Sequence, residues 1–80
     1  MKKQLHLIVN KSTRRVVAWN RRQDERDGML YELNRCAPGQ YVPGLATFDS
    51  TGAETFEPGD LTVPPPYRPD FELAKEQLLK

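Results

Sequence analysis

The chain has 80 residues, of which 29% are charged and 38% hydrophobic. That length suits one small domain, which buries only about 60% of the surface that its unfolded chain exposes. The longest apolar run, residues 7–9, is far shorter than the roughly 20 residues of a membrane-spanning helix, and no long apolar stretch follows Lys2 and Lys3. We therefore expect neither a membrane span nor a secretory signal. One cysteine, Cys36, and one histidine, His6, exclude an internal disulfide and zinc sites built from several Cys or His ligands.

The net charge of +1 conceals a division along the chain. Residues 1–36 carry nine Lys/Arg against four acids, a net of +5, whereas residues 37–80 carry three against seven, a net of −4. All seven prolines lie in the second part. Uninterrupted regular structure is therefore expected in the first part, and a chain broken by turns in the second.

Two runs rich in β-branched and aromatic residues, 4–10 and 15–20, predict strands. The connection between them, residues 11–14, is short and polar, which favours an antiparallel hairpin. The register leaves open whether Val16 or Val17 faces outward. The candidate core residues of this hairpin are Leu7, Val9, Val16, Val17 and Trp19.

Residues 21–28 are expected to form a charged connector that ends in the turn signal Asp27-Gly28. The next segment, 29–36, fits a helical stripe through Met29, Leu30 and Leu33, and equally a strand face through Met29, Tyr31 and Leu33. Periodicity cannot decide between the two in so short a run. Gly28 and Pro38 bracket the segment closely, which favours a strand and leaves the helix as the alternative.

Residues 37–44 predict a loop, and residues 45–48 and 53–56 predict a second hairpin. Its turn, 49–52, begins with Asp49 and ends with Gly52, as a four-residue connection with a bulge requires.

Residues 61–69 predict an extended polyproline II strap, because three consecutive prolines fix φ and remove three backbone donors. Asp70 is a suitable N-cap for a short helix, 70–80, whose apolar stripe is Phe71, Ala74 and Leu78. The fold class that follows is mainly β (α+β), with two antiparallel hairpins, the Pro-rich strap and this C-terminal helix.

We expect a small β-rich body over residues 1–56 and an extended Pro-rich arm with its helix over residues 57–80. The stripe containing Phe71 and Leu78 has no evident place on so small a body, so it is predicted to dock on a partner. The alternative folds the helix back onto its own sheet as the lid of the core.

The sequence offers no catalytic, cofactor-binding or metal-binding site. Nucleophilic catalysis needs a nucleophile, a base and an orienting group, and nothing brings Cys36 and His6 together. Cys36 is expected to be a small buried residue and His6 a structural one. The five glycines are scattered, which argues against a phosphate-binding loop. We therefore expect a non-enzymatic protein without a cofactor.

Five arginines lie on the first hairpin and its exit, with Trp19 between them: Arg14, Arg15, Arg21, Arg22 and Arg26. Guanidinium forks suit phosphates and an aromatic ring can stack on bases. The pI of about 7.9, however, is below the value above roughly 9 that is typical of nucleic-acid-binding domains. We therefore expect an Arg-rich face that meets an acidic protein surface or is solvated, with nucleic acid the less favoured partner.

The run Pro64, Pro65, Pro66, Tyr67 matches the PPxY pattern that WW domains bind as a polyproline helix. The other interpretation is a stiff strap lying on its own protein or on a neighbour.

The segment LIVNKSTRRVVAW, residues 7–19, resembles the opening hairpin of some short accessory structural proteins of tailed bacteriophages. The resemblance implies a capsid-cementing, neck or tail-fibre-attachment role within the virion, or in the host cytoplasm during assembly. The expected partners are other virion proteins, with the chain present in several copies of a symmetric complex. The alternative is a small inhibitor or adaptor that binds a host protein or nucleic-acid machine through the Arg-rich face.

Overall fold

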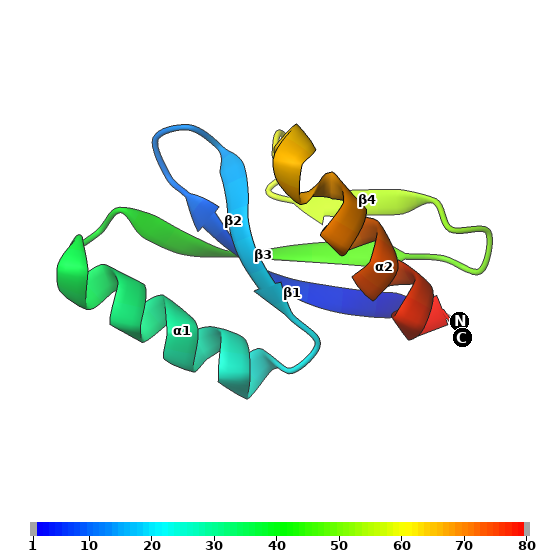
Figure 1. Ribbon diagram of the computed structural model, residues 1–80, viewed down its shortest axis with the longest axis horizontal. Helices are drawn as coiled ribbons and strands as arrows, with labels where there is room; N and C mark the ends of the chain where they lie inside the picture. Colours follow the sequence, from blue (N-terminus) through cyan, green and yellow to red (C-terminus); the bar gives the residue numbers. More distant parts are fainter. Residues whose placement is uncertain (1, 80) are drawn as a thin grey trace.

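The chain forms a four-stranded antiparallel sheet in the order β2-β1-β3-β4, as the computed structural model of residues 2–79 shows (Figure 1). Helix α1 follows β2, and helix α2 follows β4 after a short 3-10 turn. The elements are β1 (Lys3–Asn10), β2 (Arg15–Asn20), α1 (Gln23–Cys36), β3 (Tyr41–Phe48), β4 (Glu54–Glu57), the turn η1 (Pro65–Tyr67) and α2 (Arg68–Leu79). The predicted α+β class is confirmed.

Both predicted hairpins are confirmed. β1 pairs with β2 and β3 pairs with β4, each pair antiparallel. In the second turn the Asp49 carboxylate accepts the backbone N–H groups of Thr51 at 2.8 Å and Ala53 at 3.1 Å, while Gly52 adopts a φ of 83°. The loop expected over residues 37–44 is wrong in its second half, because β3 begins at Tyr41 and pairs with β1 along its whole length.

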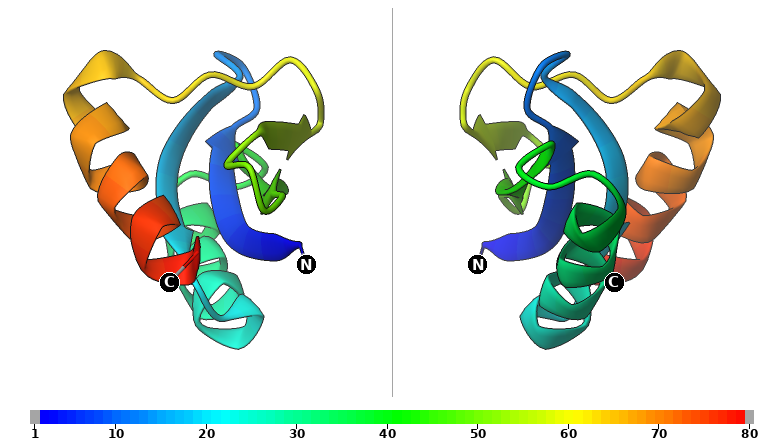
Figure 2. Two further views of the ribbon diagram at one scale, coloured as in Figure 1. Left: turned by 90° about the vertical axis from the view of Figure 1, so that its right-hand side faces the viewer. Right: turned by 90° about the vertical axis from the view of Figure 1, so that its left-hand side faces the viewer.

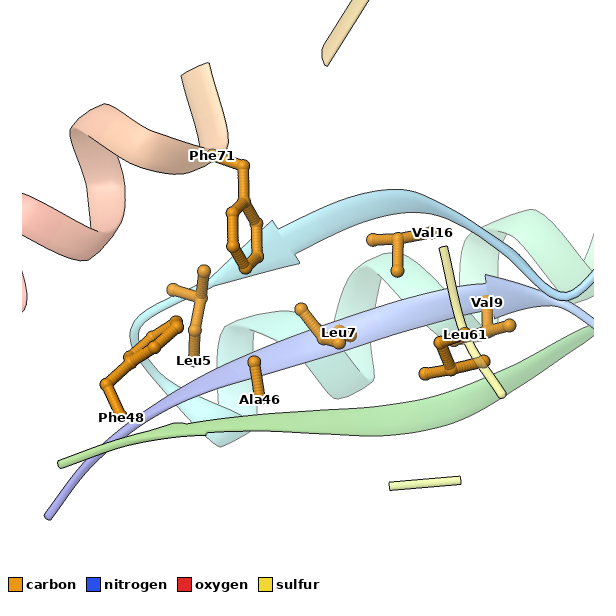
Figure 3. Packing of buried hydrophobic residues seen from close by; sticks show 8 residues of the cluster. All are labelled: Leu5, Leu7, Val9, Val16, Ala46, Phe48, Leu61 and Phe71. Atoms are coloured by element: carbon orange, nitrogen blue, oxygen red, sulfur yellow. The ribbon is translucent and has the colours of Figure 1, made fainter. Parts of the chain in front are cut away.

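The main core lies on the face of the sheet that α2 covers (Figure 3). Alternate residues of β1 point into it, and Phe71 of α2 joins them with no exposed surface. Its ring lies edge-on to Trp19 and to Phe48, with centroid distances of 5.5 and 5.9 Å. The buried cluster is Leu5, Leu7, Val9, Val16, Ala46, Phe48, Leu61 and Phe71.

The apolar stripe of α2 packs on this chain's own sheet, so the prediction that Phe71 and Leu78 face a partner is wrong. Phe71 is fully buried, and Leu78 is partly buried against the same core. The radius of gyration is 12.3 Å, close to the roughly 11.6 Å expected for a compact domain of this length. Residues 57–79 thus share one core with the residues before them, because an uncovered face of β1 and β3 offers the apolar stripe a site within the chain.

The strap before α2 is held to the edge of β2 by backbone hydrogen bonds. Thr62 accepts the N–H of Val16 at 2.9 Å and donates its own N–H to the Arg14 carbonyl at 3.1 Å. Leu61, only 6% exposed, enters the core beside these bonds. The strap therefore has backbone partners of its own.

The polyproline II conformation predicted for residues 61–69 is wrong beyond Pro64. Pro64 has φ −57° and ψ 142°, but Pro65–Tyr67 form a 3-10 turn that leads into α2 at Arg68. A proline φ near −65° suits both polyproline II and the first turn of a helix. The buried Phe71 decides between them, because the chain turns at Pro65 to bring that ring onto the sheet.

The charged connector over 21–28 and the strand favoured over 29–36 are both wrong, because one helix spans Gln23–Cys36. The second face of the sheet carries Ile8, which is fully buried although it lies outside the main cluster. Helix α1 packs against β1, β2 and β3. A helical stripe of half-buried residues, Met29, Leu30 and Leu33, can cover that face, whereas a strand would have needed a free sheet edge.

Gly44 in β3 makes room for the strap. A Cβ atom at this position would lie 2.9 Å from Val9 Cγ2, 3.3 Å from the Glu57 carbonyl oxygen and 3.3 Å from Leu61 Cδ1. Gly28, within α1, is the opposite case, since a Cβ atom there would meet nothing within 4 Å.

We expect Gly44→Ala to destabilise the fold by about 1–3 kcal/mol through overpacking. Gly28→Ala is the matched control and should raise stability by about 1 kcal/mol, because alanine favours a helix interior. Urea unfolding followed by circular dichroism measures both. Equal stability of Gly44→Ala and the wild type would show that Leu61 does not pack as described.

Phe71→Ala should cost about 3–5 kcal/mol, most of the stability of so small a domain. Leu73→Ala is the control, because Leu73 lies on the same helix with 55% of its surface exposed. Thermal unfolding should show a large fall in midpoint for Phe71→Ala and little change for Leu73→Ala. Similar midpoints for the two variants would contradict the packing of α2 on the sheet.

Candidate functional site

An open groove of about 660 Å³ runs between α1 and the edge strand β2. Its floor is apolar and formed by both elements, and two carboxylates stand at its margin. The lining residues are Val17 and Ala18 of β2, Glu25, Gly28, Met29, Glu32 and Leu33 of α1, and Tyr41 of β3.

A β-bulge in β2 places Val17 in this groove. Ile8 pairs with Ala18 and Val9 pairs with Val16, so Val17 is the extra residue opposite β1. Val16 is fully buried in the core, while Val17 is 36% exposed. The bulge thereby turns an apolar residue outward at a sheet edge, a position where bulges commonly re-aim a side chain. The sequence had left the choice between Val16 and Val17 open.

At Gly28 the wall of the groove that α1 forms carries no side chain. Gly28 lies inside α1, where glycine is about 1 kcal/mol less favourable than alanine. Apart from its two chain neighbours and the nearby backbone of α1 itself, no atom of the described chain lies within 4 Å of the position of its missing Cβ, so packing against other parts of the chain does not require glycine there. The absent side chain allows another backbone to approach α1 closely.

The margin of the groove is acidic. Glu32 forms an ion pair with Arg35 at 3.3 Å, with both side chains largely exposed. Within residues 2–79, Glu25 has no ion-pair partner within 4.0 Å. The groove therefore presents an apolar floor and an acidic margin, whose Glu25 also interacts electrostatically with Arg22.

The structure does not bring the five predicted arginines together. Arg14 and Arg15 lie at one end of β2, and Arg21 and Arg22 follow its other end. Arg22 is paired with Asp24 at 3.1 Å.

Arg26 is not on the surface at all, since only 7% of its side chain is exposed. Its Nη1 donates to the backbone carbonyls of Leu7 and Gly44, both at 3.0 Å, and its Nε donates to Asp27 at 2.8 Å. Leu7 and Gly44 are cross-strand partners, so this guanidinium fastens α1 to the centre of the sheet. The prediction that Arg26 contacts a partner is therefore wrong.

The PPxY run is accessible but not extended. Pro65, Pro66 and Tyr67 are exposed, while Pro64 is half-buried. The Tyr67 N–H donates to the Pro64 carbonyl at 2.9 Å and closes the 3-10 turn. A WW domain binds the extended form, so its binding would require this turn to open.

Cys36 and His6 occupy different parts of the molecule. Cys36 is exposed at the end of α1, so the expectation that it is buried is wrong. His6 lines a smaller cleft of about 350 Å³, together with Gln4, Gln23, Arg26 and Glu57. Gln23 begins α1 and Cys36 ends it, which separates them by about 20 Å along the helix.

Among residues 2–79, no three His, Cys, Asp or Glu side chains are grouped so that they could hold a metal ion. Neither helix of that part of the chain is long and apolar enough to cross a membrane.

The pH dependence of stability should include a contribution from His6. Burial and the nearby charge of Arg26 lower the pKa of its imidazole below the ordinary value of 6.5, against a smaller opposing effect of Asp27. As the pH falls below 6.5, the unfolded chain takes up a proton that the folded chain resists, so stability decreases.

As the pH is lowered below 6.5, we expect the urea concentration at the unfolding midpoint to decrease for the wild type. The decrease should be smaller for His6→Gln, which has no titrating imidazole. Gln4→Asn, in the same cleft but without a titrating group, should follow the wild type. Parallel profiles for wild type and His6→Gln would contradict the prediction.

The groove was not among the sites predicted from the sequence, although a signal for it was present. Met29 and Leu33 are one helical turn apart, with Gly28 beside them and acids at 25 and 32 on the same side. Assigning 29–36 to a strand concealed this spacing. Compared with protein-family models, known protein sequences and solved structures, the chain shows no match.

Proposed function

We propose that this chain is a non-enzymatic protein-interaction subunit whose groove between α1 and β2 binds a basic segment of another protein molecule. The observation that carries the proposal is an accessible apolar floor beside a glycine that internal packing does not require. Burial of that floor supplies a favourable free energy of association. Glu25 and Glu32 at its margin select a positively charged occupant.

We propose that the chain is part of a symmetric assembly, and the assembly we favour is a tailed-bacteriophage particle. The resemblance of residues 7–19 to accessory proteins of such particles supports this setting, which co-sedimentation with intact particles tests. The inhibitor or adaptor alternative has less support, because Arg14 and Arg15 are separated from Arg21 and Arg22 by the length of β2.

A displayed library of random peptides, selected against the full chain, tests the groove directly. The enriched peptides should carry Lys or Arg near apolar residues or long aliphatic side chains. Their affinity, measured by fluorescence polarisation, should fall about tenfold or more for Val17→Asp, because Val17 lies on the floor.

Leu73→Asp introduces the same kind of change at an exposed apolar residue of α2, outside the groove, and should leave binding unchanged. Peptides that bind Val17→Asp and the wild type equally, or a selection that enriches acidic peptides, would refute the proposed function.

A further inference from the structure

We propose that the occupant of the groove is the β1–β2 turn of a second copy of this chain, so that copies associate head to tail. This inference rests on the proposed function of the groove and names its partner. The turn comprises residues 11–14, and Arg15 follows it as the first residue of β2.

The turn presents a cluster of positively charged side chains. Lys11, Arg14 and Arg15 are all exposed. The nearest acid is Asp60, 3.6 Å from Arg14, in a pair whose side chains are 53% and 65% exposed. Such an exposed pair contributes little, so the arginine is available to a stronger partner.

The turn is also held in shape before any partner arrives. The Asn10 side chain accepts the N–H groups of Ser12 at 3.0 Å and Thr13 at 3.2 Å, and the Gln40 amide at 2.9 Å. Arg14 has a φ of 60°, in the left-handed region, which directs the chain back into β2. An ordered turn loses little conformational entropy on binding.

One chain does not fill its own groove with its own turn. Figures 1 and 2 show the β1–β2 turn extending beyond the end of β2, away from α1. The contact therefore requires two molecules.

Turn and groove carry opposite charges. The methylene stems of Arg14 and Arg15 can lie along Val17 and Met29 while their guanidinium groups reach Glu25 and Glu32. Gly28 leaves space for the backbone of the turn against α1. Pairing of two grooves face to face would instead oppose carboxylate to carboxylate, which like-charge repulsion disfavours.

A contact between different surfaces of identical chains leaves one turn and one groove free at the ends of each open oligomer. Such a contact closes into a ring or continues as a helical array. The proposed symmetric assembly would be built in this way.

Sedimentation equilibrium of the full chain tests the inference. The wild type should rise above its mass of 9.2 kDa with concentration, and less so at high salt, because the contact is partly ionic. A turn variant, Arg14→Asp with Arg15→Glu, and a groove variant, Gly28→Trp, should each weaken self-association about tenfold or more. Aspartate tolerates the left-handed φ at position 14, and a Cβ atom at position 28 would meet nothing within 4 Å.

The decisive measurement is a mixture of the two variants. The turn variant keeps an intact groove and the groove variant keeps an intact turn, so the mixture should form one-to-one dimers and stop there. Lys2→Glu with Lys3→Glu, a matched charge change at the start of β1 and away from the turn, should associate like the wild type. Circular dichroism checks that each variant is folded.

A wild type that stays monomeric at millimolar concentration, or a turn variant that associates normally, would overturn the inference. A mixture that fails to dimerise would overturn it as well. If the selected peptides still bind the groove in any of these cases, the proposed function stands and only the identity of its partner is wrong. If peptide binding fails too, both proposals fall.

Discussion

The burial of Phe71 is the contact on which the arrangement of the C-terminal third depends. Its ring closes a core that Leu5, Phe48 and residues of β2 would otherwise leave open to water. Ion pairs also join α2 to β4, from Arg68 to Glu54 at 2.7 Å and from Lys75 to Glu54 at 3.3 Å. Because the desolvation of partly buried ion pairs offsets much of their attraction, the apolar contact supplies most of the attachment.

Because α2 seals one face of the sheet, α1 alone covers the other. It is attached to the sheet at two points. Arg26 donates to the backbone carbonyls of Leu7 and Gly44 at 3.0 Å, and the Asn34 side chain exchanges two hydrogen bonds of 3.1 Å with the backbone of Tyr41. Met29 and Leu33 between these points are only half-buried. The groove beside β2 is the space that this attachment leaves, and the outward Val17 makes its other wall apolar.

The buried Arg26 shows how one residue changes role between sequence and fold. In the sequence it was one of several arginines in a basic segment and was predicted to face a partner. In the fold its guanidinium donates to two carbonyls and to Asp27, so the charge is hydrogen-bonded and paired, as a buried charge has to be. What remains of the basic segment is two separate pairs of arginines. Arg14 and Arg15 lie where the ordered turn, which we propose as the ligand of the groove, enters β2.

The sequence by itself determined the two hairpins, because strand alternation and turn chemistry act between residues close in the chain. Asn10, Asp49 and Gly52 shape their turns through local hydrogen bonds and φ values. Only the tertiary structure decided the helix over 23–36, the 3-10 turn at Pro65–Tyr67 and the exposure of Val17. Short apolar runs and prolines are each compatible with two conformations. Which one forms depends on packing against residues that are distant in the sequence. The groove belongs to this second group, since it exists only where α1 from one segment lies beside β2 from another.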